Sequence, residues 1–289
     1  MLKNYSNKRL ISGIVLGVLG FLIIYMGGWW FSISLGVIVH LALLEFFKMA
    51  EFKGIRPATK TTLLACQILL ITTQLGMDGI ISDYFTAAVL PLSGAAICGW
   101  LLLQPITGSI SDVAASIFGL FYLGFLPSHW LKLRNIEYLR TQDLSYLNNS
   151  EFLNIGLSIT LSACFMIVAF DIGSYFFGKK IGKRSLSPIS PGKTIEGAIS
   201  GLICSIIVGF IAISLFNIEM NFLIKLLLGV IISLFALVGD LTESMLKRDA
   251  GLKDSGNALP GHGGILDRID SYLFTPAVFY YIFILINPI

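Results

Sequence analysis

The chain is a succession of long apolar runs separated by short breaks of polar, glycine or proline residues. These runs match the ~20 apolar residues that a helix needs to cross the hydrocarbon core of a bilayer. Runs such as 199–216 and 222–238 are almost continuously apolar, whereas the strands of a membrane β-barrel alternate polar and apolar residues. We therefore predict an all-α polytopic membrane protein with about nine transmembrane helices, eight or ten being the alternatives. The expected helices cover residues 10–26, 29–48, 61–77, 84–103, 112–130, 152–177, 197–216, 221–239 and 271–286.

The composition excludes a soluble enzyme. Of the 289 residues, 55% are hydrophobic and only 13% are charged, while a soluble domain carries about 25% charged residues. The formal net charge of +3 is too small to indicate a nucleic-acid partner. All four cysteines lie inside apolar runs without a CxxC spacing, so we interpret them as packing residues rather than as redox or metal sites.

The distribution of Lys and Arg predicts the orientation in the membrane. If the N-terminus lies in the cytoplasm and nine helices follow, sixteen of the twenty basic residues fall on the cytoplasmic side. This excess agrees with the positive-inside rule and places the C-terminus outside. Three regions follow: residues 1–130 with about five N-terminal transmembrane helices, an outer polar loop over 131–151, and a C-terminal transmembrane region over 152–289 with cytoplasmic loops at 178–196 and 240–270.

The C-terminal region also holds most of the residues that could carry chemistry. Nine of the seventeen carboxylates lie within residues 171–270. A helix that continues from residue 239 brings a carboxylate, a hydroxyl and two cations to one face: Asp240, Ser244, Lys247 and Arg248. Asp267 and Asp270, three residues apart, share a face of the next helix. Between these two helices, four glycines allow backbone N–H groups to approach an anion: Gly256, Gly261, Gly263 and Gly264.

This mixture of charges indicates a site for a metal-bound polyphosphate. Carboxylates alone would bind a hard cation, and Lys or Arg alone would bind phosphate. Together they suit Mg²⁺, which takes one or two carboxylates plus phosphate oxygens while the basic side chains neutralise the remaining charge. A solvated cytoplasmic loop is the alternative for Lys253 and Asp249. It is a weaker account of Asp240, because a carboxylate at the end of an apolar run is costly and usually functional.

Residues 244–270 resemble the signature of the CDP-diacylglycerol synthases, also called phosphatidate cytidylyltransferases. That pattern combines a serine, K-R, K-D, L-P, H-G-G and D-R-x-D at fixed spacing. The matching positions are Ser244, Lys247, Arg248, Lys253, Asp254, Gly256, Leu259, Pro260, His262, Gly263, Gly264, Asp267, Arg268 and Asp270. A match over 27 positions is highly specific.

Two further stretches belong to the same resemblance. Asp171, Tyr175 and Gly178 are similar to the family's D-x-x-[AS]-Y-x-x-G. The stretch from Ser190 to Gly197 is similar to its S-P-x-K-T-x-E-G, with Gly192 where relatives often carry a longer polar residue. The Gly-Lys-Thr inside it is not a P-loop, because no glycine stands five places before the Gly-Lys pair. From the residues alone, we expect Ser190 or Thr194 to cap the following helix.

The resemblance implies an enzyme that converts CTP and phosphatidate into CDP-diacylglycerol and pyrophosphate, as an integral protein of a bacterial plasma membrane with its active site facing the cytoplasm. The bilayer is then its environment, and the family suggests a homodimer. We expect Asp240, Asp267 and Asp270 to hold Mg²⁺, with a second cation as a further option. The expected catalytic residues are Lys247, Arg248, Lys253, Asp254, His262 and Arg268. The expected substrate-binding residues are Asp171, Tyr175, Ser190, Lys193, Thr194, Glu196, Ser244, Gly263 and Gly264.

Two other functions remain as alternatives. One is a membrane phosphotransferase acting on a lipid alcohol, similar to a dolichol kinase, which differs in using a hydroxyl rather than a phosphate as the acceptor. The other is a secondary transporter, which is disfavoured because the charges gather at one membrane edge rather than near the midplane. Gly197 and Gly201 are expected to form a helix-packing face. Glu45 is interpreted as either a site residue or an interfacial one.

Overall fold

The fold is described from a computed structural model, for residues 13, 15, 17–136, 155–218, 220–256 and 263–286. His262 and most of the expected loop 131–151 lie outside these residues. Helices dominate the described part, so the prediction of an all-α polytopic membrane protein is confirmed at this level. The helices are the short Gly17–Met26, α2 Gly28–Phe52, α3 Thr59–Met77, α4 Asp83–Leu102, α5 Ile110–Gly119, α6 Leu126–Arg134, α8 Ile155–Ile181, α9 Ile195–Leu215, α10 Phe222–Asp249, α11 Leu266–Ile269 and α12 Thr275–Ile286.

Each of the nine expected apolar segments coincides with one of these helices or with a continuous set of them. Seven of the described helices are long and apolar enough to cross a membrane. They are Gly28–Phe52, Tyr84–Leu102, Ile110–Arg134, Ile155–Ile181, Ile195–Leu215, Phe222–Asp249 and Leu266–Ile286. The helix Gly17–Met26 is shorter, and α3 carries several Thr and Gln residues that lower its apolar character.

The structure adds features that the hydrophobic pattern did not predict. A π-helix over Leu120–Phe125 joins α5 to α6. Two short antiparallel strands, β1 Ser185–Ser187 and β2 Ser190–Thr194, form a hairpin inside the expected loop 178–196. Helix α10 continues to Asp249, so the first ten residues of the expected loop 240–270 are helical. The polar face proposed for that continuation therefore exists as a helix face.

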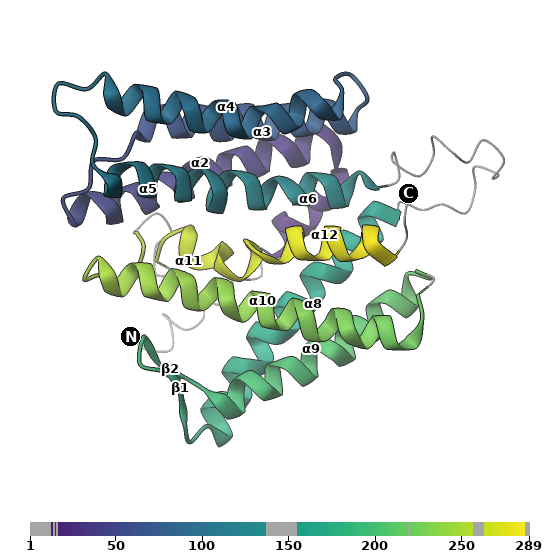
Figure 1. Ribbon diagram of the computed structural model, residues 1–289. Coiled ribbons are helices and arrows are strands. Elements are labelled where there is room, and N and C mark those ends of the chain that lie inside the picture. Colours follow the sequence, from purple (N-terminus) through teal and green to yellow (C-terminus); the bar gives the residue numbers. More distant parts are fainter. Residues whose placement is uncertain are drawn as a thin grey trace.

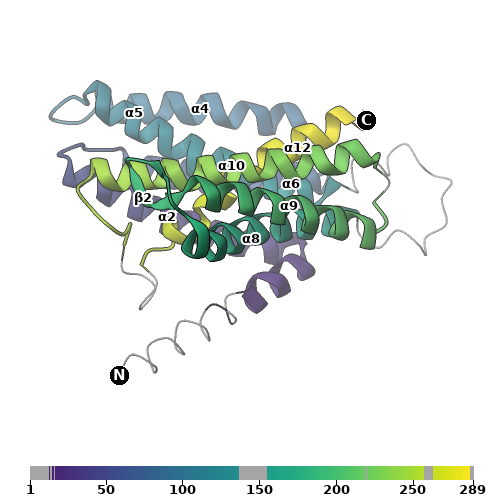
Figure 2. The same cartoon turned by 90° about the horizontal axis from the view of Figure 1, so that it is seen from below.

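The helices run side by side and turn at two ends of the bundle (Figure 1). In this view α3 and α4 form the upper layer, α8 and α9 the lower one, and α10 and α12 lie between them. The turns after α2, α8 and α10 and the hairpin lie at the same end, on the left of Figure 1. Seen from below, the short helix Gly17–Met26 lies at the edge of the bundle (Figure 2). Arg134 of α6 holds it there by donating to the carbonyl oxygens of Ile24 and Tyr25 at 2.8 and 3.2 Å.

Glycines allow α8 and α9 to pack with their backbones close together. A Cβ added at Gly201 would lie 2.6 Å from the carbonyl oxygen of Phe170 and closer still to the hydroxyl of Ser174. A Cβ added at Gly197 would lie 2.8 Å from the carbonyl oxygen of Ser174. The predicted packing face is therefore confirmed. Such close contact is how membrane helices associate without a hydrophobic driving force between them.

We expect Gly201→Ala to separate α8 from α9 and to lower stability by about 1–3 kcal/mol, as over-packing of a close contact does. Thermal unfolding of the purified protein in detergent measures this as a lower midpoint. Gly99→Ala in α4 is the matched control, because a Cβ there meets nothing within 4 Å. Equal midpoints for the two variants would contradict the close packing.

Candidate active site

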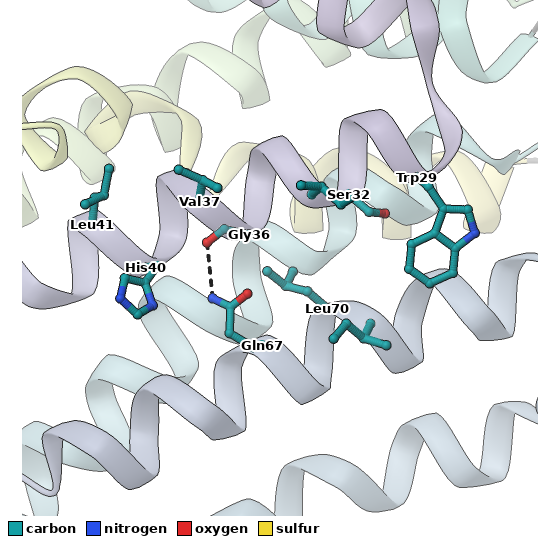
Figure 3. A pocket seen from close by; sticks show the side chains of 10 residues that line it. Trp29, Ser32, Gly36, Val37, His40, Leu41, Gln67 and Leu70 are labelled. Atoms are coloured by element: carbon teal, nitrogen blue, oxygen red, sulfur yellow. Dashed lines mark hydrogen bonds between the residues drawn. The ribbon is translucent and has the colours of Figure 1, made fainter.

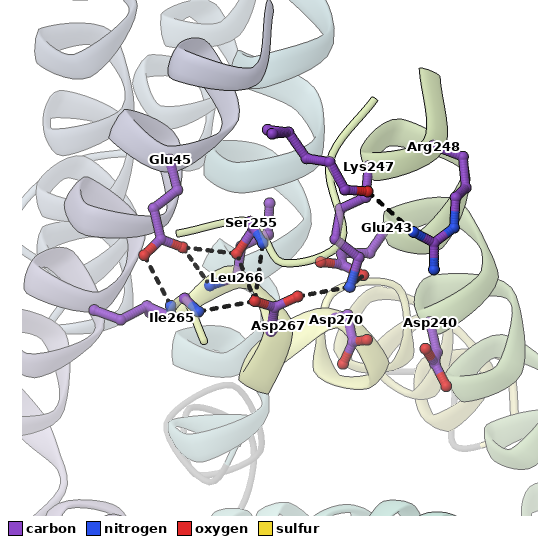
Figure 4. Close-up of polar contacts among 12 residues, drawn as sticks. Glu45, Asp240, Glu243, Lys247, Arg248, Ser255, Ile265, Leu266, Asp267 and Asp270 are labelled. Carbon is purple, nitrogen blue, oxygen red and sulfur yellow. Dashed lines mark hydrogen bonds and ion pairs between the residues drawn. The ribbon is translucent and has the colours of Figure 1, made fainter. Parts of the chain in front are cut away.

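The expected site residues gather at the end of the bundle where α8 and α10 stop and α9 and α11 begin (Figure 1). Two groups of carboxylates lie there. One is centred on Asp267 and is bound to other parts of the chain through hydrogen bonds. The other contains Asp240 and Asp270, which lie side by side in Figure 4.

Asp267 is held on both of its oxygens. Oδ1 accepts from Lys247 Nζ of α10 at 2.6 Å. Oδ2 accepts from the backbone N–H groups of Ser255 and Gly264 at 3.0 and 2.8 Å, and from the Ser255 hydroxyl at 3.0 Å. Backbone N–H groups of the glycine-rich segment therefore approach an anion, and this anion is the carboxylate of Asp267 in the chain itself. Gly263 has φ +80°, a conformation that L side chains rarely adopt.

Lys247 links Asp267 to a second carboxylate. Its ammonium lies 2.6 Å from Glu243 Oε2, one helical turn away on α10. Glu243 is fully buried, with 0% of its surface exposed, and Lys247 is its ion-pair partner. Lys247 is therefore the cation that makes a buried Glu243 tolerable, because an unpaired charge away from water is strongly destabilising.

The second group surrounds Asp240. Its carboxylate pairs with the Lys193 ammonium, which comes from β2 of the hairpin. Asp270 lies beside Asp240 (Figure 4). Asp171 of α8 completes the group and accepts from the Ser271 hydroxyl at 3.2 Å. Asp171 and Asp270 each lie near Asp240, and Lys193 is the basic partner of Asp240, so the formal charge of this group is negative.

The hairpin residues divide into structural contacts and exposed groups. Thr194 caps α9, since its hydroxyl oxygen accepts from Gly197 N–H at 3.1 Å, which confirms one of the two expected caps. Glu196 Oε2 accepts from the backbone N–H groups of Lys183 and Arg184 at 3.0 and 3.2 Å. It thereby fixes the turn that leads from α8 into the hairpin. Ser190 pairs with Ser187 across the two strands.

Other predicted site residues lie around these groups. Arg248 donates to the carbonyl oxygens of Ile189 and Leu252, which connects α10 to the hairpin. Ser244 is buried on α10. Tyr175 has 71% of its surface exposed and takes no part in the carboxylate groups. Three further predicted residues lie at the exposed rim: Lys253, Asp254 and Arg268.

Sequence reasoning left Glu45 open between a site residue and an interfacial one, and it gave Glu243 no role in the site. Glu45 lies in α2 of the N-terminal region, about 200 positions from the signature, and it accepts hydrogen bonds from Ser255, Ile265 and Leu266. One signal was present for each. Glu45 is a carboxylate near the end of an apolar helix, and Glu243 stands four residues before Lys247, the spacing of a helical ion pair.

Comparison with known proteins identifies the family. The family model described as "Cytidylyltransferase family" matches residues 7–286. The chain belongs to the cytidylyltransferase family. It is 41% identical to a phosphatidate cytidylyltransferase from Synechocystis over 98% of both chains. It is 30% identical to a phosphatidate cytidylyltransferase from Bacillus subtilis, over 97% of this chain and 98% of that one. It is 34% identical to phosphatidate cytidylyltransferase 4, chloroplastic, from Arabidopsis thaliana, over 94% of this chain and 72% of that one.

For a cytidylyltransferase, the Asp240 group has the donor chemistry that Mg²⁺ prefers. Asp240 and Asp270 present adjacent carboxylates, and the Lys193 ammonium already occupies the position of a cation next to Asp240. In the part of the chain that the structure describes, no three His, Cys, Asp or Glu side chains converge into a complete metal cage. Mg²⁺ fits this arrangement, since it is usually bound by one or two carboxylates plus substrate phosphates.

Another hollow of this cytidylyltransferase lies away from these carboxylates. A groove of about 390 Å³ runs between α2 and α3 (Figure 3) and is lined largely by apolar side chains. Its polar members include His40 and Gln67, which donates to the Gly36 carbonyl oxygen at 3.1 Å. None of the predicted site residues lines it.

We expect Lys247→Met to destabilise the protein by about 3–5 kcal/mol, the range found when one partner of a buried ion pair is removed. Thermal unfolding in detergent checks this without an activity assay. Adding Glu243→Gln to Lys247→Met should recover part of the loss, because it removes the buried charge that was left unpaired. A double variant no more stable than Lys247→Met would contradict the pairing.

Proposed function

We propose that the protein transfers a cytidylyl group from CTP to phosphatidate, giving CDP-diacylglycerol and pyrophosphate. The observation that carries the proposal is a group of carboxylates and lysines at one end of a bundle of apolar helices. A substrate with acyl chains can keep them in hydrocarbon there while its phosphate meets a water-soluble nucleotide. The names of the relatives at 41% and 30% identity over nearly the whole chain support the same reaction.

The charges of the site support a requirement for Mg²⁺. Asp171 and Asp270 lie near Asp240, and Asp240 pairs with the ammonium of Lys193. Such a negative group would repel the triphosphate of CTP. A divalent cation bound by Asp240 and Asp270 would offset this charge and stabilise the negative charge that develops on the phosphates. We propose the Asp171 carboxylate as a ligand for a second cation.

We propose two different roles for the three predicted metal ligands. Asp240 and Asp270 are the residues that we propose for the metal. Asp267 has both oxygens engaged by Lys247, Ser255 and Gly264, so we propose that it orients Lys247 and the glycine-rich segment. Lys193 forms an ion pair with Asp240 and is therefore within reach of a phosphate that a cation holds next to that carboxylate.

The proposed reaction is an in-line displacement at the α-phosphorus of CTP. A phosphate oxygen of phosphatidate forms the new P–O bond, and the bond between the α-phosphorus and the bridging oxygen of pyrophosphate breaks. A phosphate monoester loses its second proton near a pH of about 6, so the attacking oxygen needs no strong general base. The side chains of the protein then have to bind the two substrates, align the attacking oxygen with the α-phosphorus and neutralise the charge of the phosphates. Lys247, Arg248 and Arg268 are proposed to face the α-phosphate and the leaving pyrophosphate, with Lys253 and Asp254 at the rim. His262 stays a predicted catalytic residue and lies outside the described residues.

We further propose nine membrane-spanning segments, with the N-terminus and the site on the cytoplasmic side of a bacterial plasma membrane and the C-terminus outside. The alternation of helix ends between the two sides of the bundle supports this arrangement (Figure 1). The excess of Lys and Arg at the end that carries the site supports it as well. The homodimer suggested by the family resemblance stays a prediction.

Purified protein supplied with α-labelled CTP, Mg²⁺ and phosphatidate should place the label in a lipid and release unlabelled pyrophosphate. Diacylglycerol is the control acceptor. It should give no labelled lipid, because it lacks the phosphate that attacks the nucleotide. Phosphorylated diacylglycerol formed from γ-labelled CTP would instead show a lipid-alcohol kinase.

We expect Asp240→Asn and Asp270→Asn to raise the Mg²⁺ concentration that gives half-maximal rate by more than about tenfold. Loss of a residue that only hydrogen-bonds to a metal ligand already lowers metal affinity by about tenfold or more, so loss of a ligand should cost at least as much. Asp267→Asn should lower the rate with little change in that concentration, because Asp267 is proposed to orient other groups. A magnesium titration of all three variants measures the difference. If Asp267→Asn alone shifted the Mg²⁺ requirement, the division of roles would be wrong.

A further inference from the structure

Glu45 connects the N-terminal region to the signature segment. It lies in α2, only 7% of its surface is exposed, and no basic side chain of the described residues pairs with it. Its Oε1 accepts from Ile265 N–H at 3.0 Å, and its Oε2 accepts from Leu266 N–H at 2.9 Å and from the Ser255 hydroxyl at 3.1 Å. Among the described residues, the donors that compensate its charge all belong to the signature segment.

The glycines of the signature leave room for this carboxylate. A Cβ added at Gly256 would lie 2.6 Å from Glu45 Oε1. A Cβ added at Gly264 would collide with Glu45 Oε2 and with the Ser255 hydroxyl. Only glycine fits at both positions while Glu45 remains where it is. The signature segment thus contributes the glycines and the hydrogen-bond donors of this contact, and α2 contributes the accepting carboxylate.

The donors that bind Glu45 also set the position of the catalytic lysine. Ser255 donates to Glu45 and also to Asp267, and Asp267 directly follows Leu266, which donates to Glu45 as well. Asp267 in turn accepts from Lys247 at 2.6 Å. Figure 4 shows these groups in one continuous row from Glu45 to Lys247. A shift of the Glu45 carboxylate would therefore displace Asp267 and, through it, Lys247.

We infer that Glu45 is a positioning residue for cytidylyl transfer: its carboxylate fixes the signature segment, and through Asp267 it places Lys247 against the nucleotide phosphates. This inference rests on the proposed function, because it assigns the signature segment to CTP. Displacement of a group by about 1 Å can reduce catalysis by about 100-fold. The N-terminal region thereby contributes a side chain to the arrangement of the site as well as membrane helices.

The decisive variant is Glu45→Gln, which keeps the size of the side chain but places an NH2 group against one or two of the three donors that now bind the carboxylate. We expect the KM for CTP to rise by about tenfold or more and kcat to fall, while the KM for phosphatidate stays unchanged. Ser255→Ala, which removes one hydroxyl from the same contact, should shift the KM for CTP in the same direction by less. This second variant keeps the test valid if Glu45→Gln does not fold.

Asp112→Asn is the matched control. Asp112 is also a buried carboxylate of the N-terminal region that binds backbone donors, those of Arg56 and Ser109, at 2.7 Å each. It has no contact with the signature segment among its described hydrogen bonds. Its loss should lower the thermal midpoint and leave both KM values unchanged. Equal effects of Asp112→Asn and Glu45→Gln on every parameter would reduce Glu45 to a folding role and overturn the inference.

Hydrogen exchange at the backbone amides of Ile265 and Leu266 gives a readout that does not depend on activity. Glu45→Gln should accelerate exchange there, and Asp112→Asn should not. If the wild-type protein transferred no cytidylyl group, the proposed function would fail while this exchange would still test the contact. Wild-type exchange and a wild-type KM for CTP in Glu45→Gln would overturn the inference.

Discussion

The carboxylate of Asp267 is the interaction on which the arrangement of the site depends. It accepts from Lys247 of α10 on one oxygen, and from the Ser255 and Gly264 backbone on the other. Only 10% of the Asp267 side chain is exposed, and a carboxylate so largely removed from water is stable only when donors match its acceptor positions. The end of α10, the glycine-rich segment and the start of α11 must therefore keep their relative positions. Because Ser255 also donates to Glu45, the same constraint reaches α2.

This constraint separates the carboxylates of the site into two kinds. Glu45, Glu243 and Asp267 are compensated by donors and by the ammonium of Lys247, so they organise the chain. Asp240 and Asp270 share a region where positive charge is short, with Lys193 as the partner of Asp240. A hydrogen-bonded group next to carboxylates short of positive charge suits the proposed binding of a metal and a triphosphate, because the geometry exists before the substrate arrives.

The sequence predicted the helices and the chemistry better than the contacts. Continuous apolar runs locate the spans because the bilayer sets their length, and the spacing of Asp240 and Lys247 places both on one face of α10. The different proposed roles of Asp267 and Asp270 could not be predicted, since they depend on which of the two carboxylates accepts from the Ser255 amide after the segment folds. The choice between a site role and an interfacial role for Glu45 stayed open because its donors lie more than 200 positions away. The β1–β2 hairpin lacks the apolar alternation that indicates strands.

The most direct test of this account is to locate the divalent cation. Crystals of the wild-type protein grown with Mn²⁺ in place of Mg²⁺ and a non-reactive CTP analogue would be measured at the manganese absorption edge. The account predicts an anomalous peak between the carboxylates of Asp240 and Asp270, with the triphosphate next to Lys193. A peak at Asp267, or a triphosphate bound away from these carboxylates, would contradict it.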